Sequence, residues 1–541
     1  MEIRDRMSLL GHVSAVGVAL CVLLPAGASA QYRLGVTTEK VSPDAELRPA
    51  LPMSNAQRQV LLEKYLARRE AMDLANASPM VAVEQPGAER GREAVEGPPA
   101  PEADFHTPPV GAAKDPYLGR NNQNPQANGA LASNWAQTSA VNEGPHIFYT
   151  GNTHAEYSTN GGTSYNNVAI PAGPATAPNA CCDLDVIYDK GRGVTFWSVL
   201  YTDAAVSQGS VRIFVRRHIP SGNNCSSTYT PGAGILPDYA HLGLSNDFLY
   251  LTTIEGSTHK IRRYNLDELV DCVPTTVDNI SVTPAVGHRA VVPVEGATDT
   301  MYWAYHESST VIRIYYWRET AASPSSATQT INAHNHSNPD CRGGTNNTDW
   351  IEGSASYSIT GFRMRGAVGG GELGFFWNVS SDASHTQAHV HAVIVRDIPA
   401  LGFPILSQPH IFNNSSCIAY PAVGVNERGD WGMVVGWGGV SGGGGVAVHT
   451  NFSIRDDYDT GFLVHTPFAT GTHNPASSLP RWGGYQSVRR HQACGMAWSG
   501  TGYAHNGGTG VANINARYIE FMRGRDYQCY VQWRDEVPET P

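Results

Sequence analysis

The sequence predicts an all-β protein that folds as a β-propeller with six or seven blades. From about residue 134 onward, short runs of β-branched and aromatic residues alternate with turns rich in Gly, Asn, Asp and Ser. Long amphipathic helical patterns are not found in this region of the sequence. A layout of three strands joined by two turns recurs there, at a spacing of roughly 50 to 70 residues. Such a repeat is typical of a ring of similar sheets.

Each repeat unit begins with a polar first strand, continues into an aromatic-rich second strand and ends with a third strand. The first strands are CCDLDVIYD, PDYAHLGL, HRAVVPVEG, FRMRGAVGG, AYPAVGVNE and RWGGYQSVRR. The period is longer than that of the shortest propeller repeats, but it fits elaborated blades. The earlier stretch 144–168 supplies strands for a seventh blade or for closing the ring. A pair of stacked β-sandwiches is the main structural alternative.

The first thirty residues have the pattern of a secretory signal peptide. Arg4 and Arg6 precede the apolar run HVSAVGVALCVLLPAG, which ends in ASA before Gln31. Basic residues, a short apolar stretch and a small-x-small cleavage site are the three parts of such a signal. We therefore expect residues 1–30 to be removed and the mature chain to be secreted, extracellular or periplasmic, without a transmembrane segment. An uncleaved anchor is the alternative.

Residues 31–125 differ in composition from the region that follows. They contain many prolines and few aromatics, and the segment 54–75 predicts one helix with Ser54 as its N-cap. The next stretch, EQPGAERGREAVEGPPAPEAD, has too little apolar content for a core and predicts a flexible linker. We expect this part to be a tether, with a pro-segment as the alternative, and residues 126–535 to form the propeller domain.

Cysteine usage fits export. Once the signal is removed, cysteines remain at positions 181, 182, 225, 272, 341, 417, 494 and 529. An even number in an oxidising compartment predicts disulfide bonds, although the pairing cannot be read from sequence. We expect the adjacent Cys181 and Cys182 to bridge separate partners more easily than each other.

The charge of the chain bears on its partners. The formal net charge is −11, and removal of the signal, with equal numbers of basic and acidic residues, leaves it unchanged. Proteins that bind nucleic acid normally carry a basic surface. We therefore expect no nucleic-acid partner, and a neutral or polysaccharide ligand stays open. We expect a monomer.

The stretch EYSTNGGTSYNN at 156–167 resembles the Asp-box of sialidase-like (BNR) propellers. Ser158, Asn160, Gly162 and Tyr165 stand at the Ser, Asp, Gly and aromatic positions of the pattern SxDxGxxW, in degenerate form. A short polar side chain can bond the backbone of such a turn, and glycine accepts a positive φ. The resemblance implies a structural turn between the two outer strands of a blade, without a catalytic role.

Most of the propeller region resembles secreted bacterial propellers of sialidase-like architecture. The patterns DPxxxYD, PDYxxLG and RWGDYS of that group correspond here to CDLDVIYD at 182–189, PDYAHLG at 237–243 and RWGGYQS at 481–487. Leu184 and Gly484 depart from the proline and the aspartate of those patterns. Members of the group are mostly uncharacterised, so the resemblance implies a fold more firmly than a reaction. It implies extracellular carbohydrate or a glycoconjugate as the partner.

Three functions stay open on this basis. The first is an enzyme acting at the mouth of the central channel, either a sialidase-like glycoside hydrolase or a polysaccharide lyase. The second is a non-catalytic propeller for carbohydrate binding, protein binding or adhesion, and the third is a scaffold whose channel is filled by paired side chains. A sialidase needs three arginines for the substrate carboxylate, a tyrosine nucleophile with an acidic partner, and a proton donor. The arginine-containing RIP motif of sialidases is missing near the start of the propeller region.

Polar residues on the first strands are the candidate site residues, because the innermost strands of a propeller line its channel. The candidates for catalysis are Arg289, Arg481, Tyr485, His288 and Asp238. The candidates for ligand binding are Arg363, Asp183, His241, Tyr420 and Trp482, the last as a platform for sugar stacking. Further polar residues of these strands are Asp185, Arg365 and Arg489. In the structural interpretation, such side chains pair with one another or bond the neighbouring blade.

Histidines form a separate pattern. AHVHAV places His389 and His391 on one face of a strand, and NAHNHSNPDC offers His334 and His336 in a loop. Imidazole pairs can hold a divalent metal such as Zn, Mn or Ca, or copper. The alternative is chance, since 20 histidines in 541 residues produce such spacings without a metal.

Overall fold

The structure is a computed structural model of the chain. It describes residues 37–41, 57, 60, 61, 63, 64, 67, 68, 92–99, 113–123, 137–283, 291–335, 340–351, 364–476, 482, 483 and 485–536. The predicted signal peptide, residues 1–30, lies outside this part.

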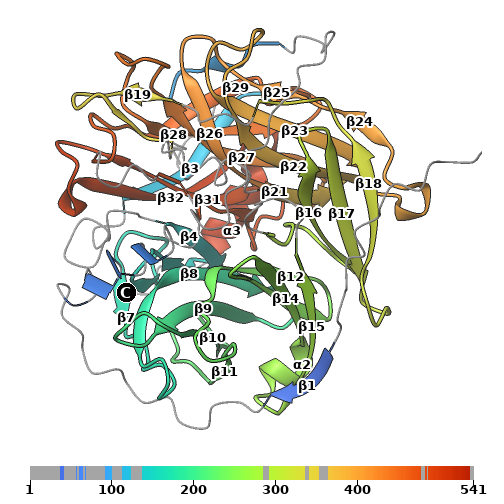
Figure 1. The fold of residues 1–541 in the computed structure, drawn as a ribbon. Helices are drawn as coiled ribbons and strands as arrows, with labels where there is room; N and C mark the ends of the chain where they lie inside the picture. Colours follow the sequence, from blue (N-terminus) through green and yellow to red (C-terminus); the bar gives the residue numbers. More distant parts are fainter. Residues whose placement is uncertain are drawn as a thin grey trace, which may run out of the picture. The chain divides into compact units, whose positions relative to one another are not determined.

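The described residues form a seven-bladed β-propeller, which confirms the predicted fold class (Figure 1). The first blade contains β4 (Ser139–Glu143), β5 (His146–Thr150), β6 (Ala155–Ser158) and β7 (Asn166–Val168). The second contains β8 (Asn179–Asp189), β9 (Val194–Thr202), β10 (Gly209–Arg216) and β11 (Cys225–Tyr229). The third contains β12 (Asp238–Leu244), β13 (Phe248–Glu255), β14 (Thr258–Asn265) and β15 (Thr275–Val282), with α2 (Leu266–Val270) between the last two.

The remaining blades follow in chain order. The fourth contains β16 (Thr300–Ser308), β17 (Val311–Arg318) and β18 (Ser325–Thr330). Segment 291–295 lies next to β16, because Val294 N–H donates to Tyr302 O at 3.1 Å. The fifth contains β21 (Arg365–Gly369), β22 (Glu372–Val379), β23 (His389–Arg396), β24 (Ile405–Ser407) and β25 (His410–Ile411). The sixth contains β26 (Cys417–Val425), β27 (Trp431–Gly438), β28 (His449–Arg455) and β29 (Val464–Ala469). The seventh contains β30 (Val488–Arg490), β31 (Trp498–His505) and β32 (Ile514–Arg523), followed by α3 (Tyr527–Glu536).

Short elements lie between these strands. They are the two-stranded ribbon β19 (Arg342–Gly343) and β20 (Thr348–Asp349), and the 3-10 turns η2 (Pro399–Leu401), η3 (Val511–Asn513) and η4 (Gly524–Asp526). None of the helices in the described part of the chain has the length and apolar content that a membrane crossing requires.

The middle strands of the blades are buried on both faces because neighbouring blades cover them. Every position of β9, with the sequence VTFWSVLYT, is buried, as expected of a strand without a solvent-facing side. At the junction of the sixth and seventh blades, a Cβ atom added to Gly432 would lie 2.9 Å from ring atoms of the fully buried Trp498. Glycine on β27 therefore allows the tryptophan of β31 to pack directly against the backbone.

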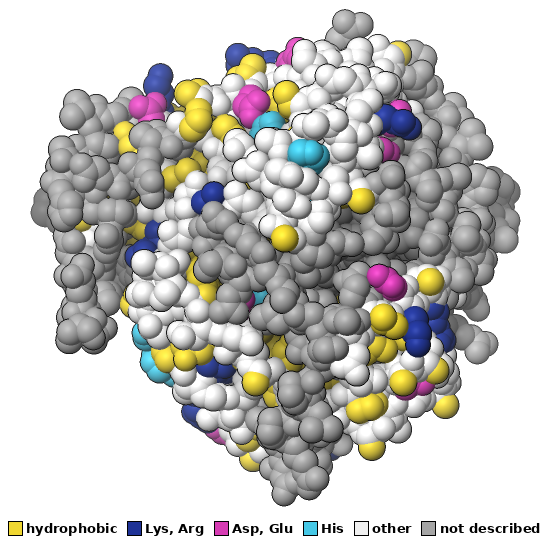
Figure 2. Space-filling model, turned by 90° about the vertical axis from the view of Figure 1, so that its left-hand side faces the viewer, with side chains coloured by type: hydrophobic (Ala, Val, Ile, Leu, Met, Phe, Trp, Pro, Cys, Tyr) yellow, Lys and Arg dark blue, Asp and Glu magenta, His cyan; other side chains and the backbone are white. Residues whose placement is uncertain are grey.

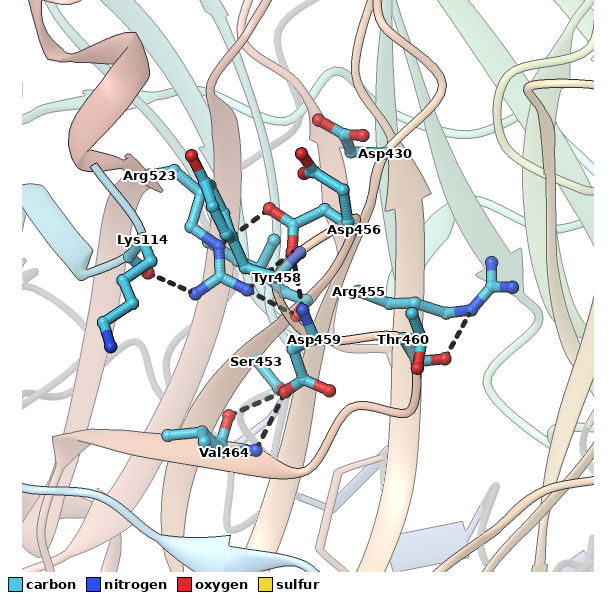
Figure 3. Close-up of polar contacts among 12 residues, drawn as sticks. Lys114, Asp430, Ser453, Arg455, Asp456, Tyr458, Asp459, Thr460, Val464 and Arg523 are labelled. Carbon is cyan, nitrogen blue, oxygen red and sulfur yellow. Dashed lines mark hydrogen bonds and ion pairs between the residues drawn. The ribbon is translucent and has the colours of Figure 1, made fainter. Parts of the chain in front are cut away.

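The ring is closed by a strand from the N-terminal part of the chain. β3 (Pro116–Gln123) pairs antiparallel with β32 and so completes the seventh blade (Figure 1). At the end of β32, Arg523 holds Asp456, with Nε to Oδ2 and Nη2 to Oδ1 both at 2.9 Å (Figure 3). Its Nη1 donates to Lys114 O, just before β3, at 2.8 Å. One arginine thus connects the sixth blade, the seventh blade and the closing strand.

Other N-terminal segments also pair with the propeller. β1 (Thr37–Val41) extends the third blade at β15, and β2 (Val95–Glu96) runs parallel to β29 of the sixth. Helical residues occur within the predicted helix 54–75, where Leu61 is buried beside Cys181, Cys182 and Leu236. Three strands that precede residue 126 are therefore part of the propeller sheets.

The cysteines form four disulfide bonds in the described residues: Cys181–Cys182, Cys225–Cys272, Cys341–Cys417 and Cys494–Cys529. The expectation that the adjacent cysteines bridge separate partners is wrong. Both lie buried at the beginning of β8, where each other's sulfur is the nearest partner.

The stretch EYSTNGGTSYNN forms the turn between β6 and β7. Ser158 Oγ accepts from Gly162 N at 2.8 Å, and Asn160 Oδ1 accepts from Ser164 N at 3.0 Å. Tyr165 is buried in the core.

Figure 2 shows one face of the molecule, on which hydrophobic, basic and acidic side chains lie in small separate groups.

Candidate functional site

The innermost strands of three blades share an unusual backbone feature. It lies at the end of the channel where these strands begin, and we call this end the first mouth. Asp183, Tyr239 and Tyr420 have φ values of 55°, 53° and 58° on the first strands of the second, third and sixth blades. In each case the pairing register shifts at the same place, which marks a β-bulge. Positive φ is rare outside glycine, and such strained positions cluster at functional sites.

Asp185, two residues after the first of these bulges, is the most extensively bonded side chain in the channel. Its Oδ1 accepts from Ser139 Oγ at 2.8 Å and from Arg489 Nη2 at 3.1 Å, and its Oδ2 accepts from Leu242 N at 3.0 Å. Burial alone would raise the pKa of this carboxyl, but the hydrogen bond with His241 and the charge of Arg489 hold it well below its usual value. Asp185 is therefore a buried carboxylate whose acceptor sites are used.

Arg489 also bonds a second carboxylate, because its Nη1 contacts Glu295 Oε1 from the fourth blade. The Glu295 side chain is about a quarter exposed, at 26 %. Burial raises the pKa of Glu295, and the charge of Arg489 compensates only part of this effect. The two carboxyl groups on one guanidinium are thus shifted in opposite directions.

Aromatic rings and a second arginine gather beside Asp185. His241 Nδ1 lies 3.5 Å from Asp185 Oδ2, and its ring stacks on Tyr485 with 4.3 Å between centroids. Arg365, half-buried on β21, places Nη1 3.4 Å from His241 Nδ1 and donates from Nη2 to Tyr239 Oη at 3.3 Å. These two contacts are long for hydrogen bonds. The Tyr485 hydroxyl is buried without a hydrogen-bond partner among the described residues, and burial raises its pKa well above the usual value.

The space around these groups is small. A cavity of about 20 Å³ is lined by Asp185, His241, Glu295, Arg365, Tyr485 and Arg489, among others. That volume holds roughly one water molecule. Towards the other end of the same strands, a cavity of about 110 Å³ is lined by residues that include Tyr188, Leu244, Glu295, Arg490 and Gln492. The described part of the channel is therefore narrow and filled by paired side chains, and a ring-sized ligand has to bind at a mouth.

The structure brings only some of the predicted site residues together. Tyr485 and His241 meet in the channel, and Asp183 Oδ2 accepts from Tyr239 N at 3.0 Å nearby. Asp238 is buried at the start of β12. Predicted residues that lie outside the described residues are His288, Arg289, Arg363, Arg481 and His336.

Trp482 and Tyr420 are core residues in this structure. Trp482 is 2 % exposed, and its ring stacks on Tyr503 with 5.0 Å between centroids and meets Trp350 edge-on at 5.4 Å. Tyr420 is buried in the same cluster, and its backbone N–H donates to Asn378 Oδ1 at 2.7 Å. Since neighbouring rings cover Trp482, it does not present a face on which a sugar could stack.

Two channel residues, Glu295 and Tyr239, were not among the sequence candidates. The bulges explain part of this, because an extra residue changes which side chains of a strand face the channel. Asp185 and Arg365, named above as further polar residues of the first strands, belong to the network, whereas Arg363 lies outside the described residues. Glu295 stands two residues after the proline in VVPVEG, and the other repeats have no acidic residue that would mark this position.

The metal candidates lie in the fifth blade and its surroundings. His389 and His391 both contact the ring of His410, with centroid distances of 5.1 and 4.2 Å, as expected of side chains on one strand face. The ring of His334 lies 5.4 Å from the ring of His391, measured between centroids. Burial and the nearby His385 lower the pKa of His410 to about 4, so its imidazole is neutral at pH 7.

Comparisons with known proteins give a fold likeness without a family. No family model matches the chain, and no curated protein matches it. Similar solved structures include the NanB sialidase from Streptococcus pneumoniae, with 8 % identity, a TM-score of 0.35 and coverage of 65 % of this chain and 68 % of that chain. An exo-β-1,3-galactanase from Phanerochaete chrysosporium has 10 % identity, a TM-score of 0.31 and coverage of 76 % and 96 %. An α-L-arabinanase from Penicillium chrysogenum has 10 % identity, a TM-score of 0.30 and coverage of 53 % and 94 %. At these scores the likenesses carry no argument about this protein's chemistry.

Proposed function

We propose that this protein is an extracellular carbohydrate-binding propeller that holds a carboxylate-bearing sugar at the first mouth of its channel. The observation that carries the proposal is the position of Arg365 among Tyr239, His241 and Tyr485. A guanidinium has five N–H donors and binds carboxylates in a bidentate manner. Arg365 lines the small cavity beside His241 and Tyr485, so its guanidinium lies where a ligand carboxylate at this mouth would bind.

Two further features support a ligand at this place. The buried Tyr485 hydroxyl has no hydrogen-bond partner among the described residues, and such groups usually meet a water or a ligand. The backbone strain at Asp183 and Tyr239 lies at the same mouth, where strain is retained when it serves a site. The four disulfides agree with an extracellular protein.

The state of Asp185 favours binding over hydrolysis. A general base needs a lone pair that faces the reacting group. The oxygens of Asp185 already accept hydrogen bonds from Ser139, Arg489 and backbone N–H groups inside the channel. The raised pKa of Tyr485 likewise disfavours a tyrosinate nucleophile at neutral pH.

Binding can be tested with the purified full chain and immobilised glycans. Sialosides, uronic-acid polymers and matched neutral sugars are presented together, and the affinity of the best ligand is then measured by calorimetry. Arg365→Ala should weaken binding of the acidic sugar at least tenfold. The affinity of Arg365→Lys should lie between those of wild type and Arg365→Ala, because lysine keeps the positive charge but lacks the planar set of N–H donors that binds a carboxylate in a bidentate manner. Arg396→Ala is the matched control, because Arg396 is exposed at the end of β23 in the same blade. Failure to bind any acidic glycan, or unchanged binding by Arg365→Ala, contradicts the proposal.

Glycoside hydrolysis is the second candidate, and Glu295 favours it. Its raised pKa and its partial exposure suit a proton donor. The same glycans, incubated with the protein and assayed for released reducing ends, test this function. Turnover that disappears in Glu295→Gln while binding persists would establish hydrolysis with Glu295 as the acid; absence of turnover across sialosides and uronic polymers would exclude it for those substrates.

A further inference from the structure

Three buried histidines of the fifth blade stand in an arrangement that the channel site does not use. His385 precedes β23, His389 begins β23, and His410 begins β25, which pairs with β23. One ring nitrogen from each lies within 4.8 Å of the other two. The exposed fractions of the three residues are 3 %, 0 % and 8 %. A polar cluster this well buried needs partners for its nitrogen atoms.

The hydrogen bonds of two of the rings fix which nitrogen is free. His389 Nδ1 lies 3.0 Å from Gln387 O, so Nδ1 carries the proton and Nε2 presents a lone pair. His385 Nδ1 lies 3.0 Å from both carboxylate oxygens of Asp382, so its Nε2 also presents a lone pair. That Nε2 atom is buried without a hydrogen-bond partner among the described residues.

These are the contacts that orient histidine ligands in metal centres. A metal-binding imidazole normally donates its other N–H to a carboxylate or a backbone carbonyl, which sets the tautomer and the ring direction. Here the Asp382 carboxylate accepts from His385 Nδ1, and Gln387 O accepts from His389 Nδ1. The third ring, His410, places Nδ1 2.9 Å from His389 Nε2. Two nitrogens bound to one tetrahedral ion at about 2.1 Å lie about 3.4 Å apart, so these two atoms need to separate by only about 0.5 Å to share an ion.

We propose that His385, His389 and His410 bind one divalent transition-metal ion, with zinc as the best match, and that Asp382 positions His385 for it. Three neutral imidazoles suit Zn²⁺, Co²⁺, Ni²⁺ or Cu²⁺. Ca²⁺ does not fit, because it takes oxygen ligands. The ion ties the loop before β23 to β23 and β25, so it stabilises the outer part of the fifth blade. His391 stacks on His410 with 8° between the ring planes and packs against the site without being one of the three ligands.

The alternative without a metal is a hydrogen-bonded pair of histidines, in which His410 Nδ1–H donates to His389 Nε2. The two alternatives differ in what the protein does with added metal. The full chain is produced without a histidine tag, treated with a chelator and dialysed. Zn²⁺ alone is then titrated by calorimetry, Co²⁺ binding is followed by its visible absorption, and thermal unfolding is recorded with and without Zn²⁺.

The expected result is one tight site per chain, a tetrahedral Co²⁺ spectrum and a higher Tm with Zn²⁺. His389→Ala should weaken Zn²⁺ binding at least a hundredfold, and Asp382→Asn about tenfold. His146→Ala is the control, because Glu143, His146 and His218 form a second, more exposed group that could also take up Zn²⁺. If His389→Ala does not fold, Asp382→Asn and His410→Asn provide the same comparison. No binding with Kd below about 10 μM, or binding lost in His146→Ala but kept in His389→Ala, overturns the proposal.

Discussion

Arg489 Nη2 of the seventh blade lies 3.1 Å from Asp185 Oδ1 of the second blade. Ser139, on the innermost strand of the first blade, lies between them, with its Oγ 2.8 Å from the carboxylate and 3.4 Å from the guanidinium. Through its other nitrogen, Arg489 reaches Glu295 of the fourth blade. One arginine therefore connects blades that are not neighbours, and the channel network contributes to the ring as well as to any site at its mouth.

Replacing Arg489 should destabilise the propeller strongly. Arg489→Met leaves two carboxylates without their cation, and the Asp185 side chain is only 4 % exposed. Breaking a buried pair in this way costs about 3–5 kcal/mol of unfolding free energy. Denaturant unfolding followed by intrinsic fluorescence measures the change. Arg490→Met is the control, since Arg490 is 40 % exposed and its distance to Glu427 is 3.7 Å; equal losses in both variants would contradict a special role for Arg489.

The closing strand should depend on the geometry of Arg523 as well as on its charge. Arg523 makes a bidentate pair with Asp456 and two backbone contacts, including the one to Lys114 before β3 (Figure 3). Arg523→Lys keeps the positive charge but loses the bidentate geometry of the guanidinium. We therefore expect Arg523→Lys to be destabilised nearly as much as Arg523→Ala. Limited proteolysis should then cut before or within β3 sooner than elsewhere.

An exposed ion pair provides the comparison for this prediction. Arg342 pairs with Asp340 at 2.7 Å, and its side chain is 50 % exposed. Arg342→Ala should leave the free energy of unfolding nearly unchanged, because an exposed ion pair contributes little. If Arg523→Lys behaves like wild type, the bidentate geometry does not hold the closing strand.

The fold could be predicted from sequence because the blades repeat. Each blade supplies a polar first strand and an aromatic second strand, so six independent stretches favour the same architecture. The contribution of β3 to the last blade could not be predicted in the same way. Its sequence, PYLGRNNQ, has little β-branched content, and its partner β32 lies some four hundred residues later. Ring closure is a long-range pairing without a local signal.

The site was harder to predict than the fold, and the bulges are the reason. Alternation assigns side chains to a face only while the register holds. Asp183 and Asp185 both stand on β8, but a left-handed residue and a register shift at this point leave Asp185 with bonds to the first, third and seventh blades, whereas Asp183 accepts from Tyr239 N of the third blade. Of the histidine pair in AHVHAV, His389 belongs to the group of three, and its companions His385 and His410 come from separate segments that only the folded sheet brings together.

The disulfides should differ greatly in their effect on stability. Cys341–Cys417 closes a loop with a sequence separation of 76, which corresponds to about 4.5 kcal/mol in the loop-entropy model. Cys181–Cys182 has a separation of 1 and closes no loop beyond its own ring. We expect Cys341→Ala/Cys417→Ala to lower the denaturant midpoint far more than Cys181→Ala/Cys182→Ala. Equal losses would show that packing of the sulfur atoms, rather than chain entropy, determines the effect.

The protein should lose stability in mild acid because of His465. This residue is fully buried on β29, and its Nε2 lies 2.9 Å from Phe462 O. Burial lowers its pKa to about 4, although the backbone bond and the charges of Asp459 and Glu96 act in the opposite direction. In the unfolded chain the pKa is about 6.5, so between these values the unfolded state binds more protons. The contribution of His465 to stability is therefore complete above about pH 6.5 and is lost as the pH drops towards 4, by up to about 3 kcal/mol.

The variant His465→Gln tests this prediction, because glutamine keeps an N–H for Phe462 O but does not titrate. Tm is measured at several pH values between 7 and 4 for wild type and variant. The variant is expected to start less stable, because the ring is lost from its contact with Trp437 at a centroid distance of 5.3 Å. Its Tm should nevertheless fall less steeply through this window. Parallel curves for wild type and His465→Gln would mean that other groups cause the acid sensitivity.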